Sequence, residues 1–395
     1  MADLSTERSK GMAMLTETER QRSPAVEIEE TVDTNESSDG YVSPYGKTFT
    51  KNMWYFAAPS KALKRGEKVA KVMLNQPIMV GRDSDGKVFA MRDICPHQAV
   101  PLSAGHFDGK EVECPFHGWK FDTSGVCTEV PSLCSDQKLN LCGIKSRTYP
   151  CREVLDCIWV YFGDKPIAEA DLPEVPHAPG LKGCTYAKTT TTLLLPTHID
   201  YAVAALIDTA HVPFVHNSWW WRSQKVLKEK AKTYVPESTG WTMVKHKPSQ
   251  GSILFKLIGN YIETEISFRL PGCRREYLSY HNKTKMAGIT TLTPVDDTHT
   301  ELNHTTYWTW APPLTQMFSP IVDYFVTTFL MQDQTLALMQ EQIINKYNPR
   351  LIMTIKDAGT PGHWYFMLKK EWNDAYEQGR AFVNPIKEKV LRWRT

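Results

Sequence analysis

The sequence lacks several features that mark common protein classes. It contains no run of about eighteen apolar residues, so we expect no membrane-spanning helix. It contains no Gly-x-Gly-x-x-Gly motif, so nothing indicates a dinucleotide-binding loop of its own. No block of Lys and Arg residues occurs, and the formal net charge of +2 argues against nucleic acids or other polyanions as partners.

Cysteine pairs of the Cys-x-x-Cys type are also absent, although the chain has nine cysteines. Two of them, Cys95 and Cys114, belong to a motif described below, which leaves seven others. An odd remainder in a chain without a recognisable signal peptide predicts reduced thiols and a cytoplasmic protein. A disulfide between Cys127 and Cys134 is the weaker alternative.

Composition divides the 395 residues into four regions. Residues 1–40 have no aromatic residue and many charged ones, which predicts a disordered N-terminal extension. Residues 41–165 hold short apolar or alternating runs between turn residues, which predicts a β-rich domain. Residues 166–185 are rich in Pro and Gly and predict a linker. Residues 186–395 then form a second domain.

The second domain is predicted to combine an antiparallel meander with one long helix, so the expected fold class is α+β. Runs typical of strands, several of them alternating polar and apolar residues, indicate the meander, and they lie at 251–258, 261–270, 276–281, 287–294 and 300–310. The helix is expected over 320–347, with Ser319 as its N-cap and Pro349 just beyond its end.

The most informative stretch lies in the β-rich domain and contains two matched Cys and His pairs. The first reads Cys95-Pro96-His97, and the second reads Cys114-Pro115-Phe116-His117-Gly118-Trp119. Each pair follows a predicted strand, and each contains a Pro, which is typical of a tight loop. Two such loops, each with one Cys and one His, could close over a small metal centre.

Two kinds of centre fit these four residues. A structural zinc ion takes four such ligands, and a [2Fe-2S] cluster of the Rieske type takes two Cys on one iron and two His on the other. Zinc fingers place both Cys in one arm and both His in the other, whereas each arm here mixes Cys with His. The mixed order therefore favours the Rieske cluster, with four unrelated buried residues as the remaining alternative.

A second constellation runs from Asp208 to His216 and includes His211. On an ideal helix the two histidines would point roughly 140° apart, which is too far for one metal ion. Pro213 is expected to end a helix just after His211, so that His216 can turn back toward it. The alternative is a polar helix end whose histidines hydrogen-bond to the backbone. His198 and Asp200 are weaker spare ligand candidates.

Asp333 is the residue that could complete this second group. It falls within the apolar stripe of the predicted long helix, where an ionised carboxylate is costly unless it is paired or bound to a metal. Asp323 and Glu341 of the same helix are predicted to be surface charges instead. Two His and one carboxylate make the facial triad of non-haem Fe(II) oxygenases. The alternative is a buried acid paired with an Arg.

Together these motifs resemble those of the α subunits of the Rieske non-haem iron oxygenases, over about residues 50–350. The resemblance implies a Rieske domain followed by a helix-grip-like catalytic domain with an antiparallel sheet and a long helix. It also implies two metal centres, a [2Fe-2S] cluster on Cys95, His97, Cys114 and His117, and a mononuclear Fe(II) on His211, His216 and Asp333.

By the same resemblance, Asp208 is a bridging carboxylate that hydrogen-bonds across a subunit interface to a cluster histidine, here His117. It would carry electrons between subunits, which implies a head-to-tail homotrimer of the type built from α subunits alone. Because the chain has no dinucleotide motif, electrons from NAD(P)H would arrive through a separate reductase, with or without a ferredoxin. Gln340 matches a polar residue that often follows the ligand Asp by two turns.

The implied activity is the hydroxylation or oxidative dealkylation of an apolar, aromatic or cyclic substrate with O2, or alternatively aromatic cis-dihydroxylation. A hypothesis from another class is a Rieske electron-transfer protein without oxygenase activity, which would need no facial triad. The chain departs from the family at Gln98-Ala99, where Arg-Gly is usual. Trp219–Trp221 could line a substrate entry or simply pack the fold.

Overall fold

The computed structural model describes residues 49–216, 227–247, 262–347 and 354–395. Predictions about the N-terminal extension, the Trp219–Trp221 run and the strand at 251–258 concern segments outside these ranges. Among the described helices, none is both long and apolar enough to cross a lipid bilayer.

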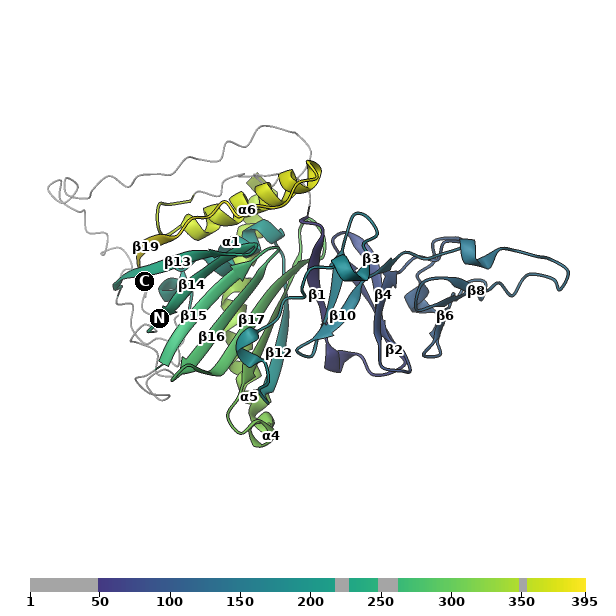
Figure 1. The fold of residues 1–395 in the computed structure, drawn as a ribbon, viewed down its shortest axis with the longest axis horizontal. Coiled ribbons are helices and arrows are strands. Elements are labelled where there is room, and N and C mark those ends of the chain that lie inside the picture. Colours follow the sequence, from purple (N-terminus) through teal and green to yellow (C-terminus); the bar gives the residue numbers. More distant parts are fainter. Residues whose placement is uncertain (1–48, 217–226, 248–261, 348–353) are drawn as a thin grey trace, which may run out of the picture.

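The N-terminal part consists of three small antiparallel sheets (Figure 1). The first has the order β1-β11-β10, with strands at Met53–Pro59, Cys157–Phe162 and Cys151–Val154. The second has the order β2-β3-β4-β9, with strands at Glu67–Met73, Gln76–Arg82, Val88–Arg92 and Thr148–Tyr149. The third has the order β5-β6-β7-β8, with strands at His106–Phe107, Glu111–Glu113, Lys120–Asp122 and Cys127–Glu129. This last sheet lies at the end of the molecule farthest from the large sheet.

The C-terminal part is built on one eight-stranded antiparallel sheet with the order β12-β18-β17-β16-β15-β14-β13-β19. Its strands, in chain order, are Ala187–Leu195, Glu229–Glu237, Gly240–His246, Ile262–Arg269, Cys273–Tyr280, Lys283–Pro294, Thr300–Trp308 and Lys389–Arg394. Strands β13 to β18 follow one another in sequence and in space, as a meander requires, so the predicted α+β architecture with an antiparallel sheet is confirmed. Strands β12, β13, β14 and β19 were not predicted.

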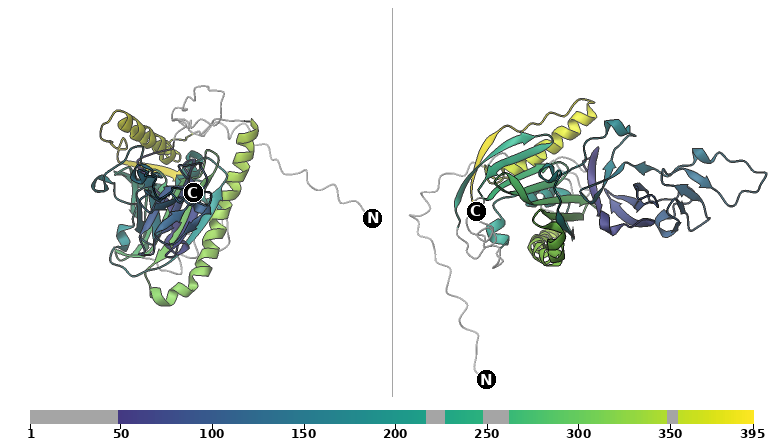
Figure 2. Two further views of the ribbon diagram at one scale, coloured as in Figure 1. Left: turned by 90° about the vertical axis from the view of Figure 1, so that its right-hand side faces the viewer. Right: turned by 60° about the horizontal axis from the view of Figure 1, so that its bottom comes forward.

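Helices lie against this sheet (Figures 1 and 2). They are α1 at Ile199–Ile207, α2 at Val212–Val215, α4 at Pro312–Thr315, α5 at Ser319–Tyr347 and α6 at Thr360–Glu377. The long helix is confirmed, but Ser319 has helical backbone angles and is not an N-cap, because a 3-10 turn at Gln316–Phe318 leads directly into α5. Helix α6 was not predicted.

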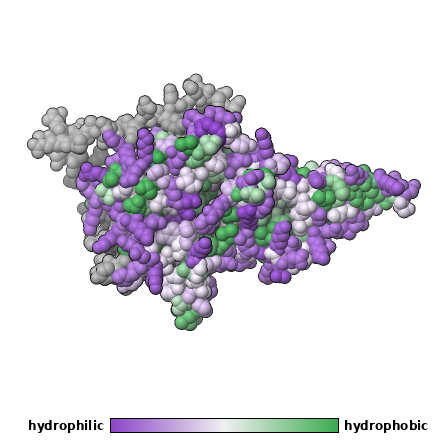
Figure 3. Space-filling model, in the orientation of Figure 1, coloured by the Kyte–Doolittle hydropathy of each residue, from purple (hydrophilic) through white to green (hydrophobic). Residues whose placement is uncertain are grey.

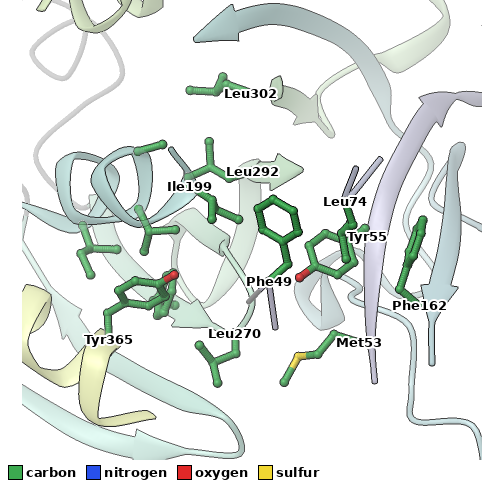
Figure 4. Close-up of a cluster of buried hydrophobic side chains, with 14 of the residues drawn as sticks. Phe49, Met53, Tyr55, Leu74, Phe162, Ile199, Leu270, Leu292, Leu302 and Tyr365 are labelled. Atoms are coloured by element: carbon green, nitrogen blue, oxygen red, sulfur yellow. The ribbon is translucent and has the colours of Figure 1, made fainter. Parts of the chain in front are cut away.

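The two parts of the chain share one hydrophobic core, in which strand β1 meets helices α1 and α6. Tyr55 of β1, Ile199 of α1 and Tyr365 of α6 are all buried in it, as the close-up in Figure 4 shows. The Lys71 Nζ atom also lies 2.8 Å from Glu301 Oε1, which joins β2 to β18. The core therefore fixes α1, and the loop that follows it, relative to the large sheet.

Apolar residues also reach the surface at the β5–β8 end of the molecule (Figure 3). Phe116 is 55% exposed and Leu139 is 47% exposed, and both lie in loops of this end.

Candidate metal centres

The two loops of the first site have the same backbone geometry. In the first, Cys95 N–H donates to Val100 O and Ala99 N–H donates to Cys95 O, at 2.8 and 2.9 Å. In the second, Cys114 N–H donates to Trp119 O and Gly118 N–H donates to Cys114 O, at 2.8 and 3.0 Å. Cys95 and Cys114 thus occupy equivalent positions in the two loops, whereas His97 and His117 differ by one position.

Equivalent positions in the two loops also require a left-handed backbone. Gly118 has φ +70° and Ala99 has φ +60°. Glycine adopts this conformation without penalty, whereas a residue with a Cβ atom pays about 1–2 kcal/mol. Ala99 carries a Cβ atom, so this conformation places a small strain in the first loop.

Burial separates the four side chains into two kinds. Cys95 and Cys114 are 2% and 3% exposed, whereas His97 and His117 are exposed. The two imidazole ring centroids lie 4.7 Å apart. Two buried sulfur donors beneath two adjacent exposed imidazoles form a donor set that suits a cluster with sulfur ligands on one iron and nitrogen ligands on the other.

The surroundings of these residues hold them in place. Trp119 stacks on the His97 ring, with centroids 4.5 Å apart. Burial raises the pKa of the Cys95 thiol, so a bound cation is needed to keep it deprotonated. A Cβ atom on Gly105 would lie 1.8 Å from the carbonyl oxygen of Glu113, so only glycine lets β6 approach and place Cys114.

The second site is built by the chain between α1 and α2 and by α5. Helix α1 ends at Ile207, and Asp208 is its C-cap. His211 then precedes α2 and His216 follows it, so the short helix separates the two histidines. The predicted break after His211 is wrong in detail, because Pro213 lies in the first turn of α2, where a missing N–H group costs nothing.

The structure brings three of the predicted site residues together. His211 Nε2 lies 3.3 Å from His216 Nε2, and these two atoms lie 3.8 and 3.4 Å from Asp333 Oδ1. Ligand atoms bound to one ion at about 2.1 Å and at right angles to one another lie about 3 Å apart. Within the described residues, these three make the one group of His, Cys and acidic side chains compact enough for a metal ion.

The electrostatics of this group follow from its partial burial. Burial raises the pKa of Asp333 to about 6, even though His211 and Arg274 act in the opposite direction. Burial lowers the pKa of His216 to about 4, so its imidazole is neutral at physiological pH. A neutral imidazole is the form that binds a metal. A cation at this position would stabilise the Asp333 carboxylate, whose ionised form is otherwise disfavoured.

Two further residues of α5 fix His216. The Nδ1 atom of His216 lies 3.0 Å from Gln332 Oε1, and the ring stacks on Phe329 with centroids 3.6 Å apart. A hydrogen bond at Nδ1 sets the tautomer that leaves Nε2 free to bind a metal. Sequence reasoning missed Gln332, and its position next to Asp333 was the available signal.

Asp208 lies beside this group and is partly open to solvent. Its Oδ1 atom accepts a hydrogen bond of 2.7 Å from Ala210 N–H. Its Oδ2 atom lies 3.6 Å from His211 Nδ1, and the side chain is 39% exposed. Asp208 is therefore near one candidate ligand and is accessible to another molecule.

His198 and Asp200, the weaker ligand candidates, have structural contacts instead. Asp200 is fully buried and binds Lys369 Nζ and Tyr365 OH, each at 2.7 Å, which joins α1 to α6. His198 is the N-cap of α1 and accepts a hydrogen bond from Asp200 N–H. The prediction that Asp323 is a surface charge is wrong, because its carboxylate accepts a hydrogen bond from Thr191 and so attaches α5 to β12.

Comparison with known proteins identifies the N-terminal part. Residues 53–148 match the family model described as the Rieske [2Fe-2S] domain. The identity of these β sheets as a Rieske domain is thereby established, and the [2Fe-2S] cluster is its cofactor.

Curated relatives match parts of the chain. Chlorophyllide a oxygenase of Arabidopsis thaliana is 34% identical over 179 residues, which are 45% of this chain and 31% of that protein. The 4beta-methylsterol monooxygenase of Methylococcus capsulatus is 35% identical over 130 residues, 33% of this chain and 35% of that protein. The oxygenase component of dicamba O-demethylase from Stenotrophomonas maltophilia is 31% identical over 175 residues, 43% of this chain and 49% of that protein. The chain thus matches a third to a half of these relatives.

Solved structures match most of the chain. Dicamba monooxygenase bound to dicamba superposes with a TM-score of 0.68 at 18% identity, covering 84% of this chain and 100% of that one. NdmA of Pseudomonas putida CBB5 with caffeine has a TM-score of 0.62 at 17% identity, covering 83% of this chain and 92% of that one. The chain therefore has the fold of the Rieske oxygenases, as its motifs predicted.

Proposed function

We propose that this chain is the oxygenase component of a Rieske-type system that hydroxylates or oxidatively dealkylates an apolar, aromatic or cyclic substrate with O2. The observation that carries the proposal is the convergence of His211, His216 and Asp333 in a chain that also contains a Rieske domain. An electron-transfer protein would not need this second group.

In this proposal each centre has a separate task. Cys95, His97, Cys114 and His117 hold the [2Fe-2S] cluster, and His211, His216 and Asp333 hold a mononuclear Fe(II). Such a triad supplies an iron with open positions for O2, while the cluster supplies single electrons. Gln332 and Phe329 orient His216, and the partial burial of Asp333 keeps bulk water from the carboxylate.

We further infer that electrons cross between copies of the chain through Asp208. The sheet β5–β8, which positions the cluster loops, lies at the far end of the molecule from α1 and α5 (Figure 1). His117 is exposed at that end, and Asp208 is partly exposed beside His211. A head-to-tail homotrimer would bring His117 of one copy to Asp208 of the next.

Exposed apolar residues support such an assembly. Helix α5, which carries Asp333, also has apolar side chains that are exposed to solvent. They are Tyr324 at 66%, Met331 at 50% and Met339 at 57%. The loop beside His117 exposes Phe116. Contacts between copies would remove these side chains from water, each contributing about 25 cal/mol per Å² of buried apolar surface.

The reaction type and partners complete the proposal. Relatives named as a methylsterol monooxygenase and a dicamba O-demethylase favour hydroxylation or dealkylation, while one named 3-chlorobenzoate-3,4-dioxygenase keeps aromatic dihydroxylation as the second candidate. A separate NAD(P)H-dependent reductase, with or without a ferredoxin, supplies the electrons. We propose a cytoplasmic location, which is supported by the finding that none of the nine cysteines forms a disulfide.

A single-turnover experiment tests the activity. The purified protein is reduced without oxygen, mixed with a panel of arenes, methoxyarenes and N-alkyl compounds, and exposed to O2. We expect the red-brown colour of the cluster to return together with an oxygenated or dealkylated product. Reoxidation of the cluster without product from any compound would favour the electron-transfer alternative.

Two variants separate the roles. Asp333→Ala should lose the mononuclear iron and all product while the cluster stays intact. Asp208→Asn should keep both centres but slow turnover by about tenfold or more, which corresponds to about 1.4 kcal/mol in the activation barrier. Unchanged turnover in Asp208→Asn, or a monomer in gel filtration, would remove the bridging role and leave the oxygenase proposal standing.

A further inference from the structure

We propose that Arg274 on strand β16 binds a carboxylate group of the substrate, and hence that the substrate is an organic acid with an apolar body. This inference rests on the proposed function, because it names the substrate class of that same site. It is carried by the position of Arg274 on the sheet, by its accessibility and by its incomplete pairing.

Strand register places Arg274 in one transverse row of the large sheet. Each residue of the row is directly paired with the next across neighbouring strands, in the order Trp241, Phe268, Arg274, Thr290, His304 and Thr191. Residues that pair directly across antiparallel strands lie on the same face of the sheet. The whole row therefore shares one face.

Two contacts show that this face is the one covered by the helices. At one end of the row, Thr191 donates a hydrogen bond to Asp323 of α5. Nearer the other end, the Phe268 ring contacts Tyr365 of α6 with centroids 6.0 Å apart. Arg274 lies between these two contacts and so faces the space between the sheet and the helix that carries Asp333.

On β16, the residues that face the helices are more exposed to solvent than the residues on the opposite face. If side chains filled the space under the helices, the residues facing them would be buried. Arg274, Glu276 and Leu278, on the helix-covered face, are only half-buried. Cys273 and Tyr277, on the opposite face, are buried in a separate apolar cluster. Phe268 and Thr290, on either side of Arg274 in the row, are buried, so the accessible part of this face is the stretch of β16 from Arg274 to Leu278, and a ligand would lie there.

Arg274 is also incompletely paired. Within the described residues its guanidinium has one ionic partner, Glu276, at 3.1 Å, and its side chain is 25% exposed. The neighbouring Arg275, on the opposite face, is 5% exposed and bonds to Ser267, to the carbonyl of His177 and to Glu237. Arg275 is a satisfied structural residue, whereas Arg274 keeps donors that a bidentate carboxylate could fill.

The charge of Arg274 reaches the candidate metal group. It contributes to lowering the pKa of both Asp333 and His216, although burial is the largest influence on each. Leu278 and Met286, paired on the same face and both half-buried, offer apolar contacts for the body of the molecule.

Equilibrium binding tests the inference without any need for turnover. Isothermal titration calorimetry of the full chain would compare 4-methoxybenzoate, 2-naphthoate and 1-pyrenecarboxylate with their matched primary amides, in the absence of O2. We expect at least one acid to bind about tenfold or more tightly than its amide. Arg274→Gln should abolish that preference, and Arg274→Lys should retain part of it.

Two further variants distinguish recognition from folding. Glu276→Gln removes the carboxylate that competes for Arg274 and should tighten acid binding, whereas general damage to the sheet would weaken it. Arg392→Gln changes an Arg that is 73% exposed on β19 and should have no effect. Equal affinity for acids and amides, no binding of any acid, or a preference that survives Arg274→Gln would overturn the inference.

The two proposals can fail separately. Product formation from neutral compounds, with no preference for acids in calorimetry, would contradict the role of Arg274 alone. Acid binding that depends on Arg274, with no product in single turnover, would contradict the oxygenase proposal alone.

Discussion

Replacing Lys369 by Met should strongly destabilise the C-terminal part of the chain. Lys369 Nζ lies 2.7 Å from Asp200 Oδ1, and the two side chains are 1% and 0% exposed. Tyr365 donates a second hydrogen bond of 2.7 Å to the same oxygen. Removing the ammonium group would take a paired positive charge away from a carboxylate that stays buried in the core.

The magnitude follows from this burial. Breaking a buried ion pair by removing one partner costs about 3–5 kcal/mol, because the remaining charge stays out of water. The next residue provides a matched control, since Lys370 pairs with Asp374 at 2.6 Å but is 59% exposed. An exposed pair of this kind contributes about 0–1 kcal/mol. Lys369→Met should therefore cost several times more than Lys370→Met.

Urea denaturation followed by tryptophan fluorescence would measure both variants. The free energy of unfolding should fall by about 3–5 kcal/mol for Lys369→Met, seen as a lower midpoint at an unchanged slope. The double variant Asp200→Leu with Lys369→Met should regain part of the loss, because it removes both buried charges. Equal losses for Lys369→Met and Lys370→Met would refute the reasoning.

Three further predictions concern the two sites and the sheet. Gln332→Leu should weaken binding of the mononuclear iron about 10–100-fold while the cluster absorbance stays unchanged, because His216 loses the partner that orients it. Gly105→Ala should abolish the cluster absorbance, because its Cβ atom would overlap a backbone carbonyl, whereas Gly143→Ala has no such contact and should keep it. The pKa of His304 is lowered to about 4 by burial, so unfolded His304 binds a proton between pH 6.5 and 4 while folded His304 does not. The free energy of unfolding should therefore fall by up to about 3 kcal/mol as the pH drops through that range, and His304→Gln should flatten the dependence.

Each of these has an outcome that would count against it. Iron affinity in Gln332→Leu equal to that of the unaltered protein would show that the hydrogen bond to His216 has no influence. Full cluster absorbance in Gly105→Ala would mean that β6 can move aside. If the free energy of unfolding depends on pH in the same way in His304→Gln as in the unaltered protein, groups other than His304 cause that dependence.

The candidate ligands could be predicted from the sequence because their chemistry is local. Cys95 and His97 lie two residues apart, and a loop that short brings them together whatever surrounds it. Asp333 was found by a different signal. It is a carboxylate within the apolar stripe of a helix, and burying a carboxylate is costly unless it has a partner. The structure then brought it to His211 and His216 from more than a hundred positions away.

Other features could not be predicted because they depend on tertiary contacts. The identity of Asp323 as a partner of Thr191, and of Asp200 as a partner of Lys369, requires knowing which strand or helix lies opposite. The register of six strands determines which residues share a row with Arg274. A slip of one residue would move the Arg274 side chain to the other face of the sheet. Helix α6 was missed because its main apolar residues, Trp364–Leu368, are adjacent in sequence, and a short continuous apolar run does not distinguish a helix from a strand.

The most direct test of the central claim is the iron content of the unaltered protein and of Asp333→Ala, measured together with the electron paramagnetic resonance signal of the reduced cluster. The account predicts about three iron atoms per chain in the unaltered protein and about two in Asp333→Ala, with the same cluster signal in both. About two iron atoms per chain in both proteins, with an intact cluster signal, would contradict a mononuclear iron at His211, His216 and Asp333.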